Sequence, residues 1–306
     1  MLLRYRQRVL CLNVSTELTR GNPLGLSMVL TRLDLNSGVF TGVSKTDNGK
    51  SPLAGQVVYN LGERSAHMTF LLPDSPSELS EQGAMVDALA QKAGEMGALN
   101  MLADVAEDHA GFELLRRQGF TVYAWENVWK LPSSIPSTMH YKDLWHEENE
   151  ADEPAIRGLY QTVVPPLVQN AEPFSRGPLR RLVYRQQGEL MAFTDSINGP
   201  NGFYLRPVIH PSVEDIRSLL GDLIHTLQPI GKPIYFPVRS YQAWVADSLD
   251  ELGAKSAPRR ACMVKHLAVP VLSENGALVR KRLDPRTAEP TTSIVQNSTL
   301  PGSDVH

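Results

Sequence analysis

Strand-like and helical patterns follow one another in a fixed order in the first part of the chain. The runs 55–62 (GQVVYNLG) and 64–73 (RSAHMTFLLP) predict two strands around a turn. A long helix is predicted from about Ser77 to Met96, with apolar side chains on one face: Val86, Leu89, Ala90 and Ala93. The continuous apolar run 98–106 predicts a strand that is buried on both faces. A short helix that ends at Gly119 and a long strand to Leu131 complete the pattern.

The same order returns in a second stretch of the chain. Strands are predicted at 181–196, 202–210, 232–238 and 259–270, with an amphipathic helix from Ser212 and a short helix at 243–252. Landmarks of the two stretches recur about 134 residues apart, a spacing that indicates duplicated domains rather than a short repeat. They are Pro76 and Pro211, Gly97 and Gly231, Val105 and Val238, and Gly119 and Gly253. We call the two stretches the first and the second copy.

Two segments of different composition lie outside the copies. Residues 132–153 contain two prolines, a Ser/Thr cluster and five acidic residues between Glu147 and Glu153, which predicts a solvated linker. Residues 271–306 are rich in Ser, Thr and Pro and predict a disordered tail. The predicted organisation is therefore one domain at 1–131, a linker at 132–153, a second domain at 154–270 and the tail. Helices set between strands predict an α/β (α+β) fold, with a mixed central sheet flanked by helices in each domain.

Composition narrows the class of protein. The 306 residues are 42% hydrophobic and 21% charged, as in ordinary globular proteins. With 30 basic and 33 acidic residues, the net charge of −3 argues against a nucleic-acid partner bound through a general basic field. No apolar run approaches the roughly 18 residues of a membrane span, and the start of the chain lacks the features of a secretory signal. Cys11 and Cys262 are isolated in apolar runs, so we expect reduced thiols in a cytoplasmic protein without a membrane partner.

The end of each copy carries a family resemblance. Residues 114–120 (LLRRQGF) resemble the Leu-Tyr-x-x-x-Gly-Phe pattern of the GNAT superfamily of acyl-CoA-dependent N-acyltransferases. Gly119 suits the left-handed turn at a helix end, and Phe120 starts a core strand. The second copy has 248–254 (SLDELGA), with Ala254 in place of Phe. The resemblance covers roughly 10–131 and 154–270. It implies tandem GNAT-like domains, acetyl-CoA or another acyl-CoA as cofactor, and a small-molecule or peptide amine as acceptor.

The cofactor loop of the family departs from its usual pattern in both copies. GNAT enzymes hold the diphosphate on a turn such as Arg/Gln-x-x-Gly-x-Gly/Ala, because glycines let backbone amides approach the phosphates. The first copy has Gln82 and a single late Gly83, with three acidic residues nearby: Asp74, Glu78 and Glu81. Residues 210–215 of the second copy contain no glycine, and Ser212 with Asp215 resembles a capping box. We expect both helix starts to be satisfied by their own side chains and to repel a diphosphate.

Catalytic candidates are few. The family's general acid, a Tyr in the short helix, corresponds to Leu115 and Leu249, which cannot donate a proton. Tyr123 is the substitute acid in the first copy, with Tyr241 nearby in the second, and His67 is the candidate base because it alternates with buried positions. Other polar candidates are Glu63, Asp104, Glu107, Asp108, Asp195, His210 and Arg239.

Two further clusters of charged or polar residues are candidates for ligand binding. His109 beside Glu107 and Asp108 fits no known ligand spacing, so no metal site is predicted. The arginines at 176, 180, 181 and 185 favour a solvated face, with an anionic ligand or the acidic run 147–153 as alternatives.

Two hypotheses remain for the function. In the first, an N-acyltransferase holds the pantetheine arm on the backbone of Thr69, Phe70, Leu71 and Leu72, with Gln82 and Gly83 at the cofactor loop. In the second, the pair is degenerate and serves as a binding or scaffold module that takes a protein partner or another ligand. The departures at the loops and at Leu115 favour the second hypothesis as regards activity.

Overall fold

The computed structural model describes residues 5–24, 37–44, 52–75, 82–131, 143–175, 180–227 and 231–267, with the pairs 271–272 and 278–279. The chain forms two compact units, Met1–Leu267 and Ala268–His306. Both copies lie in the first unit. In the second unit, β14 (Val271–Leu272) and β15 (Leu278–Val279) pair in an antiparallel hairpin, and the rest of the predicted tail lies outside the described residues. None of the helices in the described ranges has the length and apolar character needed to cross a bilayer.

The first copy follows the predicted order of elements. They are β1 (Leu10–Cys11), α1 (Val14–Arg20), β2 (Ser37–Ser44), β3 (Leu53–Asn60), β4 (Ser65–Leu72), α4 (Gly83–Glu95), β5 (Asn100–Ala106), α5 (Ala110–Arg117) and β6 (Thr121–Leu131). The predicted apolar face of α4 is buried, which confirms the helical periodicity. The described helix starts at Gly83, and the predicted start near Ser77 lies outside the described residues.

The second copy adds further elements to the same plan. They are β7 (Trp145–Glu147), η4 (Glu150–Asp152), α6 (Glu153–Val163), α7 (Pro166–Ala171), β8 (Arg180–Gln186), β9 (Glu189–Gly199), β10 (Gly202–Ile209), α8 (Ile216–Leu227), β11 (Ile234–Arg239), η5 (Ser240–Val245), α9 (Ala246–Glu251), β12 (Lys255–Ser256) and β13 (Arg260–His266). The predicted capping box of Ser212 does not form. Instead Asp215 accepts a hydrogen bond from the Ser218 amide at 2.9 Å, so α8 begins later than predicted.

Equivalent glycines mark the duplication in the backbone. Gly97 and Gly119 of the first copy have φ of 103° and 81°, and Gly231 and Gly253 of the second have 68° and 79°. This left-handed region favours glycine, because a Cβ atom is strained there. The constant spacing seen in the sequence therefore reflects the same turns at the same places in two copies of one fold.

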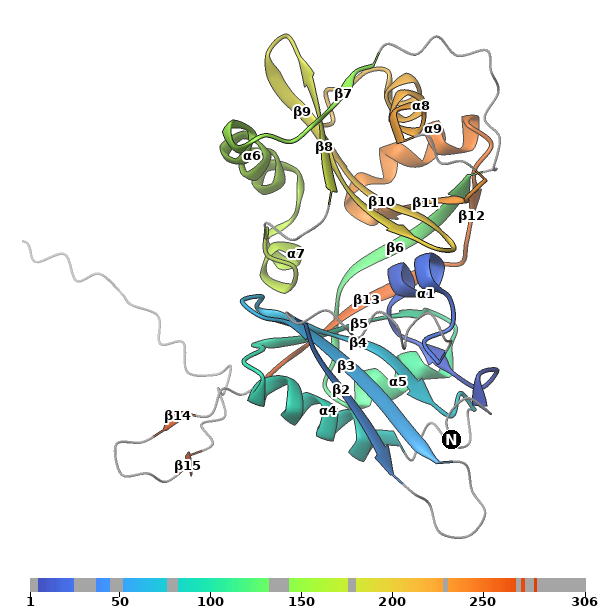
Figure 1. Ribbon diagram of the computed structural model, residues 1–306, viewed down its shortest axis with the longest axis vertical. Helices are drawn as coiled ribbons and strands as arrows, with labels where there is room; N and C mark the ends of the chain where they lie inside the picture. Colours follow the sequence, from blue (N-terminus) through green and yellow to red (C-terminus); the bar gives the residue numbers. More distant parts are fainter. Residues whose placement is uncertain are drawn as a thin grey trace, which may run out of the picture. The chain divides into compact units, whose positions relative to one another are not determined.

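One sheet runs through both copies, in the order β2-β3-β4-β5-β13-β6-β11-β10-β9-β8-β7 (Figure 1). The last strand of each copy pairs with the buried strand of the other copy. β13 pairs antiparallel with β5, from Arg260 opposite Ala106 to His266 opposite Asn100, and β6 pairs in the same way with β11. The two copies thus exchange their last strands within one compact unit.

The first helix of the first copy crosses in the same sense, whereas α6 packs on β9 and β10 of its own copy. Helix α1 packs against β9 and β10 of the second copy, and the Thr19 carbonyl accepts a hydrogen bond from the Asn201 amide at 2.9 Å. In return, α7 approaches β4, where Ser65 Oγ donates to the Ala171 carbonyl at 2.8 Å. The remaining helices cover their own copies, with α4 and α5 packed in the core of the first and α8 and α9 in that of the second.

The acidic run at the predicted linker is ion-paired. Residues 145–147 form β7 beside β8, and Glu147, Glu148 and Asp152 pair with Arg180, Arg181 and Arg185 at 2.7, 3.1 and 2.5 Å. The described part of the run is therefore ion-paired to these three arginines, although Arg180 and Glu147 remain exposed. The structure matches the alternative in which the arginines pair with the acidic run. Residues 132–142 and Arg176 lie outside the described ranges.

Candidate functional site

The two parallel strand pairs part soon after they meet, and this geometry defines a cleft in each copy. β4 pairs with β5 only over Ser65–His67, and β10 pairs with β11 only at Phe203 and Tyr204. Beyond these points the edges of β4 and β10 lose their parallel partners. Buried backbone donors and acceptors must be satisfied by something else, so the occupant of each edge decides what the cleft can bind.

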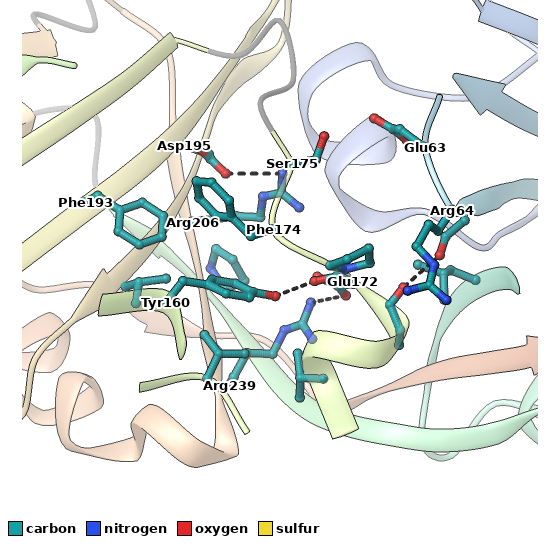
Figure 2. A pocket seen from close by; sticks show the side chains of 18 of the residues that line it. Glu63, Arg64, Tyr160, Glu172, Phe174, Ser175, Phe193, Asp195, Arg206 and Arg239 are labelled. Atoms are coloured by element: carbon teal, nitrogen blue, oxygen red, sulfur yellow. Dashed lines mark hydrogen bonds and ion pairs between the residues drawn. The ribbon is translucent and has the colours of Figure 1, made fainter. Parts of the chain in front are cut away.

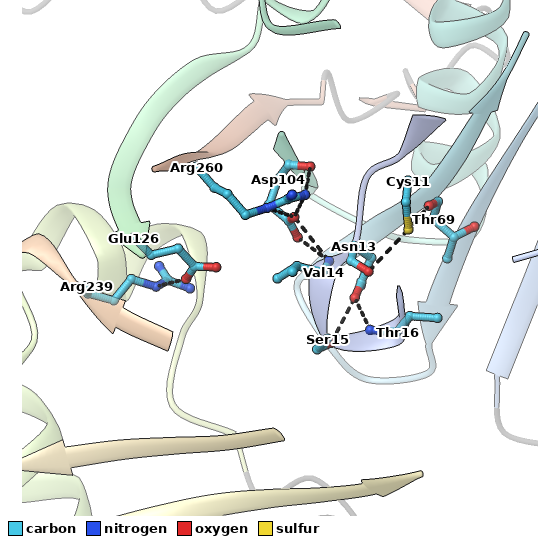
Figure 3. A network of polar contacts seen from close by, with 10 residues as sticks. All are labelled: Cys11, Asn13, Val14, Ser15, Thr16, Thr69, Asp104, Glu126, Arg239 and Arg260. Atoms are coloured by element: carbon cyan, nitrogen blue, oxygen red, sulfur yellow. Dashed lines mark hydrogen bonds and ion pairs between the residues drawn. The ribbon is translucent and has the colours of Figure 1, made fainter. Parts of the chain in front are cut away.

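In the first copy, the chain itself lies between the parting strands, and Figure 3 shows Cys11 beside Thr69 and Val14 beside Asp104. β1 pairs antiparallel with β4, with Leu10 opposite Leu71 and Cys11 opposite Phe70. Leu12 then bridges the two parting strands: its amide donates to the Thr69 carbonyl at 2.9 Å, and its carbonyl accepts from the Asp104 amide at 3.0 Å. Residues 8–12, which we call the N-terminal plug, therefore lie along the edge of β4 that β5 leaves unpaired.

An ion pair fixes the plug from the β5 side. The Asp104 carboxylate accepts from the Val14 amide at 2.9 Å and from Arg260 Nε and Nη2 at 3.0 and 2.5 Å. Asn13 caps α1 through a 3.0 Å bond from the Thr16 amide. Asp104, a candidate base in the sequence, thus anchors the start of α1, and its partner Arg260 comes from the exchanged strand β13.

In the second copy, a side chain occupies the corresponding edge. β4 and β10 each have eight residues, so 206–209 of β10 correspond to 69–72 of β4. Gln242 Oε1 accepts from the Ile209 amide at 3.0 Å, and its Nε2 donates to the Pro207 carbonyl at 3.2 Å. The residue is 4% exposed. The side-chain amide of Gln242 therefore satisfies these backbone hydrogen-bonding groups of β10 as a paired peptide group would.

A pocket of about 350 Å³ opens beside this edge (Figure 2). It lies against α6, α7 and strands β8 to β11 of the second copy, and the first copy adds the β3–β4 turn with Ser65 and His67 of β4 and Leu102 of β5. Apolar walls come from aromatic, aliphatic and proline residues, among them Tyr160, Phe174, Phe193, Pro207 and Val208. The charged groups from the second copy are Glu172 and Asp195 with three arginines, Arg181, Arg206 and Arg239, and the β3–β4 turn adds Glu63 and Arg64.

Glu172 is the centre of the polar wall. Its carboxylate accepts from Arg239 Nη2 at 3.0 Å and from the Tyr123 hydroxyl, while its backbone carbonyl accepts from the Tyr160 hydroxyl. Burial raises the pKa of this carboxyl, but the charges of Arg239 and Arg206 with the two hydrogen bonds outweigh it and lower the pKa to about 2. Glu172 therefore stays ionised at neutral pH.

The three arginines differ in how well they are paired. Arg239 has Glu126 at 2.6 Å and Glu172 at 3.0 Å, and Arg181 has Asp195 at 2.7 Å and Glu148 at 3.1 Å. Arg206 has a single 3.8 Å contact with Asp195. Among the described residues, Arg206 Nε and Arg239 Nη1 are buried atoms without a hydrogen-bond partner. Two donors at this pocket are thus left without an acceptor.

The catalytic candidates of the first copy meet at this second-copy pocket. His67 lines it, and burial lowers the pKa of its imidazole. Tyr123 reaches Glu172 from the exchanged strand β6, and burial raises the pKa of its hydroxyl, which stays protonated and donates. The structure therefore brings both residues near one carboxylate, and their catalytic roles stay predictions.

The cofactor candidates of the first copy contribute to its core. Phe70, Leu71 and Leu72 are fully buried, and Thr69 Oγ1 donates to Gln56 Oε1 at 2.9 Å. Gln82 Nε2 donates to the Pro73 carbonyl at 2.7 Å, and a Cβ atom at Gly83 would lie 2.6 Å from Gln118 Nε2. These contacts fix β4 and the start of α4, and a cofactor could reach this edge only after the plug had moved.

The remaining candidates have separate partners. Glu107 accepts from Arg259 Nε at 2.7 Å, whereas His109 Nδ1 accepts from the Gly111 amide at 3.0 Å and its Nε2 lies 3.1 Å from Asp74. Leu115 and Leu249 are fully buried in the two cores. Tyr241 lines the pocket, and burial raises the pKa of its hydroxyl to about 12.

Sequence reasoning missed Leu12, Glu172 and Gln242. Leu12 belongs to a short apolar run with no helical or strand period of its own, and Glu172 follows a short helix in an ordinary polar segment. The sequence signal for this pocket was Arg206, a charged residue in β10 at a position where the strand pattern predicts an apolar residue. The long-range contacts that make these residues important arise from the exchange of strands and helices.

Solved structures of low sequence identity are similar to this chain. A GCN5-related N-acetyltransferase from Sphaerobacter thermophilus matches with a TM-score of 0.50 and 11% identity, over 80% of this chain and 87% of that one. A functionally unknown conserved protein from Staphylococcus epidermidis gives 0.48 and 8%, over 78% and 97%. A tandem GNAT protein from the clavulanic acid biosynthesis pathway gives 0.46 and 12%, over 76% and 84%. No family model and no curated protein matches the sequence. The chain has a tandem GNAT fold.

Proposed function

We propose that this chain is a non-catalytic, tandem GNAT-like binding protein that takes a small molecule in the pocket of its second copy. One observation carries the proposal: the strand edges that a GNAT enzyme offers to acyl-CoA are hydrogen-bonded to the chain's own groups in both copies. The acidic cofactor loops and the apolar Leu115 and Leu249 support the same conclusion. We keep the cytoplasmic location as part of this proposal, since both cysteines are free thiols. The proposal also includes binding to a protein partner.

The two clefts differ in how firmly they are closed. Opening the first requires loss of several backbone hydrogen bonds, each worth about 0.5–1.5 kcal/mol net, and exposure of Leu12, which is 1% exposed. Burial of a leucine side chain contributes about 1.5–3 kcal/mol more. Opening the second requires only that Gln242 give up two side-chain hydrogen bonds. Any residual binding of acyl-CoA is therefore expected in the second copy.

This difference favours a second candidate function, acyl transfer in the second copy. The pocket touches both β10 and β11 beyond the point where they part, through Pro207 and Pro237. An acceptor amine in the pocket would attack the thioester carbonyl of an acyl-CoA that had displaced Gln242. The carbon–sulfur bond would then break, and the thiolate would take a proton from Tyr241, whose pKa of about 12 keeps it protonated. The proton lost by the attacking nitrogen would return to the Tyr241 oxygen.

A titration with acetyl-CoA separates the two candidates. We expect no binding to the unaltered protein at millimolar ligand, by calorimetry or thermal shift. Gln242→Ala is compared with Gln91→Ala, an exposed glutamine of α4. If both variants also fail to bind, the binding-protein proposal stands. Stoichiometric binding to the unaltered protein, together with acetyl transfer to an amine, would replace it by the enzyme. Binding that appears only in Gln242→Ala would show that Gln242 is what closes the second cleft.

A further inference from the structure

We infer that the pocket of the second copy binds a small monocarboxylate with an apolar body, and that Arg206 anchors the carboxylate. This inference rests on the proposed function, because it names the ligand class of the same pocket. Four observations carry it: how fully each arginine is ion-paired, which buried atoms lack a hydrogen-bond partner, which acidic residues surround them, and which apolar side chains form the walls.

Arg206 is the arginine of the inner wall that is available to a ligand, whereas Arg64 lines the pocket from the β3–β4 turn, where it is exposed. Arg181 and Arg239 each hold two carboxylates of the protein at 3.1 Å or less, and Arg181 also stacks on Phe174 and Phe193. Arg206 has only the 3.8 Å contact with Asp195, and its side chain is 38% exposed where it lines the cavity. A planar guanidinium in this state offers parallel donors to an incoming carboxylate.

The unsatisfied atoms at this pocket require an acceptor. Among the described residues that line it, the buried side-chain atoms that lack a hydrogen-bond partner are Arg206 Nε and Arg239 Nη1, and both are donors. The acids of the second copy, by contrast, are engaged: Glu172 with Arg239 and Tyr123, and Asp195 with Arg181, while Glu63 lines the pocket from the β3–β4 turn. A cationic amine would have to compete with arginines for these carboxylates, whereas an oxygen acceptor completes what the pocket lacks.

The surrounding charges limit the ligand to one negative charge. Glu172 and Asp195 lie in the same wall as Arg206, and the pKa of about 2 keeps Glu172 ionised. A phosphate dianion would bring a second charge against them, while a carboxylate brings one and has the planar geometry of the guanidinium. The side chains of Tyr160, Phe174 and Val208 supply an apolar wall for the remainder of the molecule. A volume of about 350 Å³ suits a small organic ligand.

Calorimetric titration with 3-phenylpropionate tests the inference, with 3-phenylpropionamide and 2-phenylethyl phosphate as the neutral and dianionic comparators. We expect the unaltered protein to bind the carboxylate more tightly than either comparator. Arg206→Gln should weaken this binding at least about tenfold, the effect of losing a charge-assisted hydrogen bond. Arg206→Lys keeps the charge without the planar fork and should also weaken it. Arg217→Gln, an exposed arginine of α8, is the matched control and should bind like the unaltered protein.

Several results would overturn the inference. They are failure of the unaltered protein to bind the carboxylate, equal binding by the amide or tighter binding by the phosphate, and unchanged affinity in Arg206→Gln that melts like the unaltered protein. If Arg206→Gln melts early, Arg206→Lys and the comparison of the three ligands decide instead. A parallel titration with acetyl-CoA keeps the two proposals apart, since binding of acetyl-CoA contradicts the proposed function whatever the carboxylate does.

Discussion

Arg239 of β11 lies opposite Glu126 of β6, and its Nε is 2.6 Å from the Glu126 carboxylate. The two residues come from different copies and face each other because the last strand of the first copy is paired with the buried strand of the second. Glu126 is 2% exposed, and burial raises the pKa of its carboxyl although the charge of Arg239 lowers it. The ion pair thus marks the seam at which the two copies become one sheet.

Glu126→Gln should destabilise the protein by about 1.5–3 kcal/mol, because Arg239 loses a charged acceptor at a buried site. Glu113→Gln is the control, since its pair with Arg116 is exposed and should contribute less than about 1 kcal/mol. Urea unfolding of both variants measures the difference. Equal stability of Glu126→Gln and the unaltered protein would show that the seam does not depend on this pair.

Protonation of Glu172 should lower the free energy of unfolding at acidic pH. Its pKa is lowered from 4.5 to about 2 in the folded protein, so its contribution is fully present above pH 4.5 and is lost as the pH falls towards 2. We expect Glu172→Gln to be less stable at pH 7 and to lose less stability between pH 4.5 and 2. Urea midpoints measured over this range test the prediction. The assignment is wrong if the variant and the unaltered protein show the same slope.

The N-terminal plug should be an integral part of the core. Leu12→Ala is expected to cost about 2–5 kcal/mol, as is usual for a buried leucine. Leu61→Ala, at a position 82% exposed, should stay within about 0.5 kcal/mol of the unaltered protein. A small effect of Leu12→Ala in thermal or urea unfolding would mean that the plug is only loosely held.

The crossing of α1 onto the second copy is tested at Gly199. A Cβ atom there would lie 2.2 Å from the Thr19 carbonyl oxygen, so Gly199→Ala must push α1 away from β9 and should destabilise the protein by more than about 1 kcal/mol. Gly158→Ala is the matched change, because nothing lies within 4 Å of that position in α6. It should stabilise the protein by about 0.5–1 kcal/mol through helix propensity. Similar effects of the two changes would contradict the observed contact.

Local features of the fold follow from the sequence, because they depend on neighbours along the chain. The apolar face of α4 and the left-handed glycines at 97, 119, 231 and 253 are set by helical periodicity and backbone sterics. The repetition of these features identified two copies of one fold. Helix starts were less accurate: Asp215 rather than Ser212 caps α8, since either polar residue suits a cap when considered alone.

The exchange of strands could not be predicted, because β6 and β13 are similar apolar strands that fit either copy. For the same reason, the sequence assigned His67 and Tyr123 to the first copy, whereas the fold carries both to Glu172 beside the second-copy pocket. The acidic run was predicted to be solvated because its arginine partners lie about 33 residues further along the chain, beyond the reach of local pattern. The candidate site thus depends on contacts between copies.

Hydrogen exchange at two amides tests the closure of the clefts most directly. The Asp104 amide donates to Leu12 in the first copy, and the Ile209 amide donates to Gln242 in the second. We predict that both amides exchange slowly in the free protein and that millimolar acetyl-CoA leaves their rates unchanged. Rapid exchange of either amide in the free protein, followed by protection when acetyl-CoA is added, would show an open cleft that binds the cofactor and would contradict the proposed function.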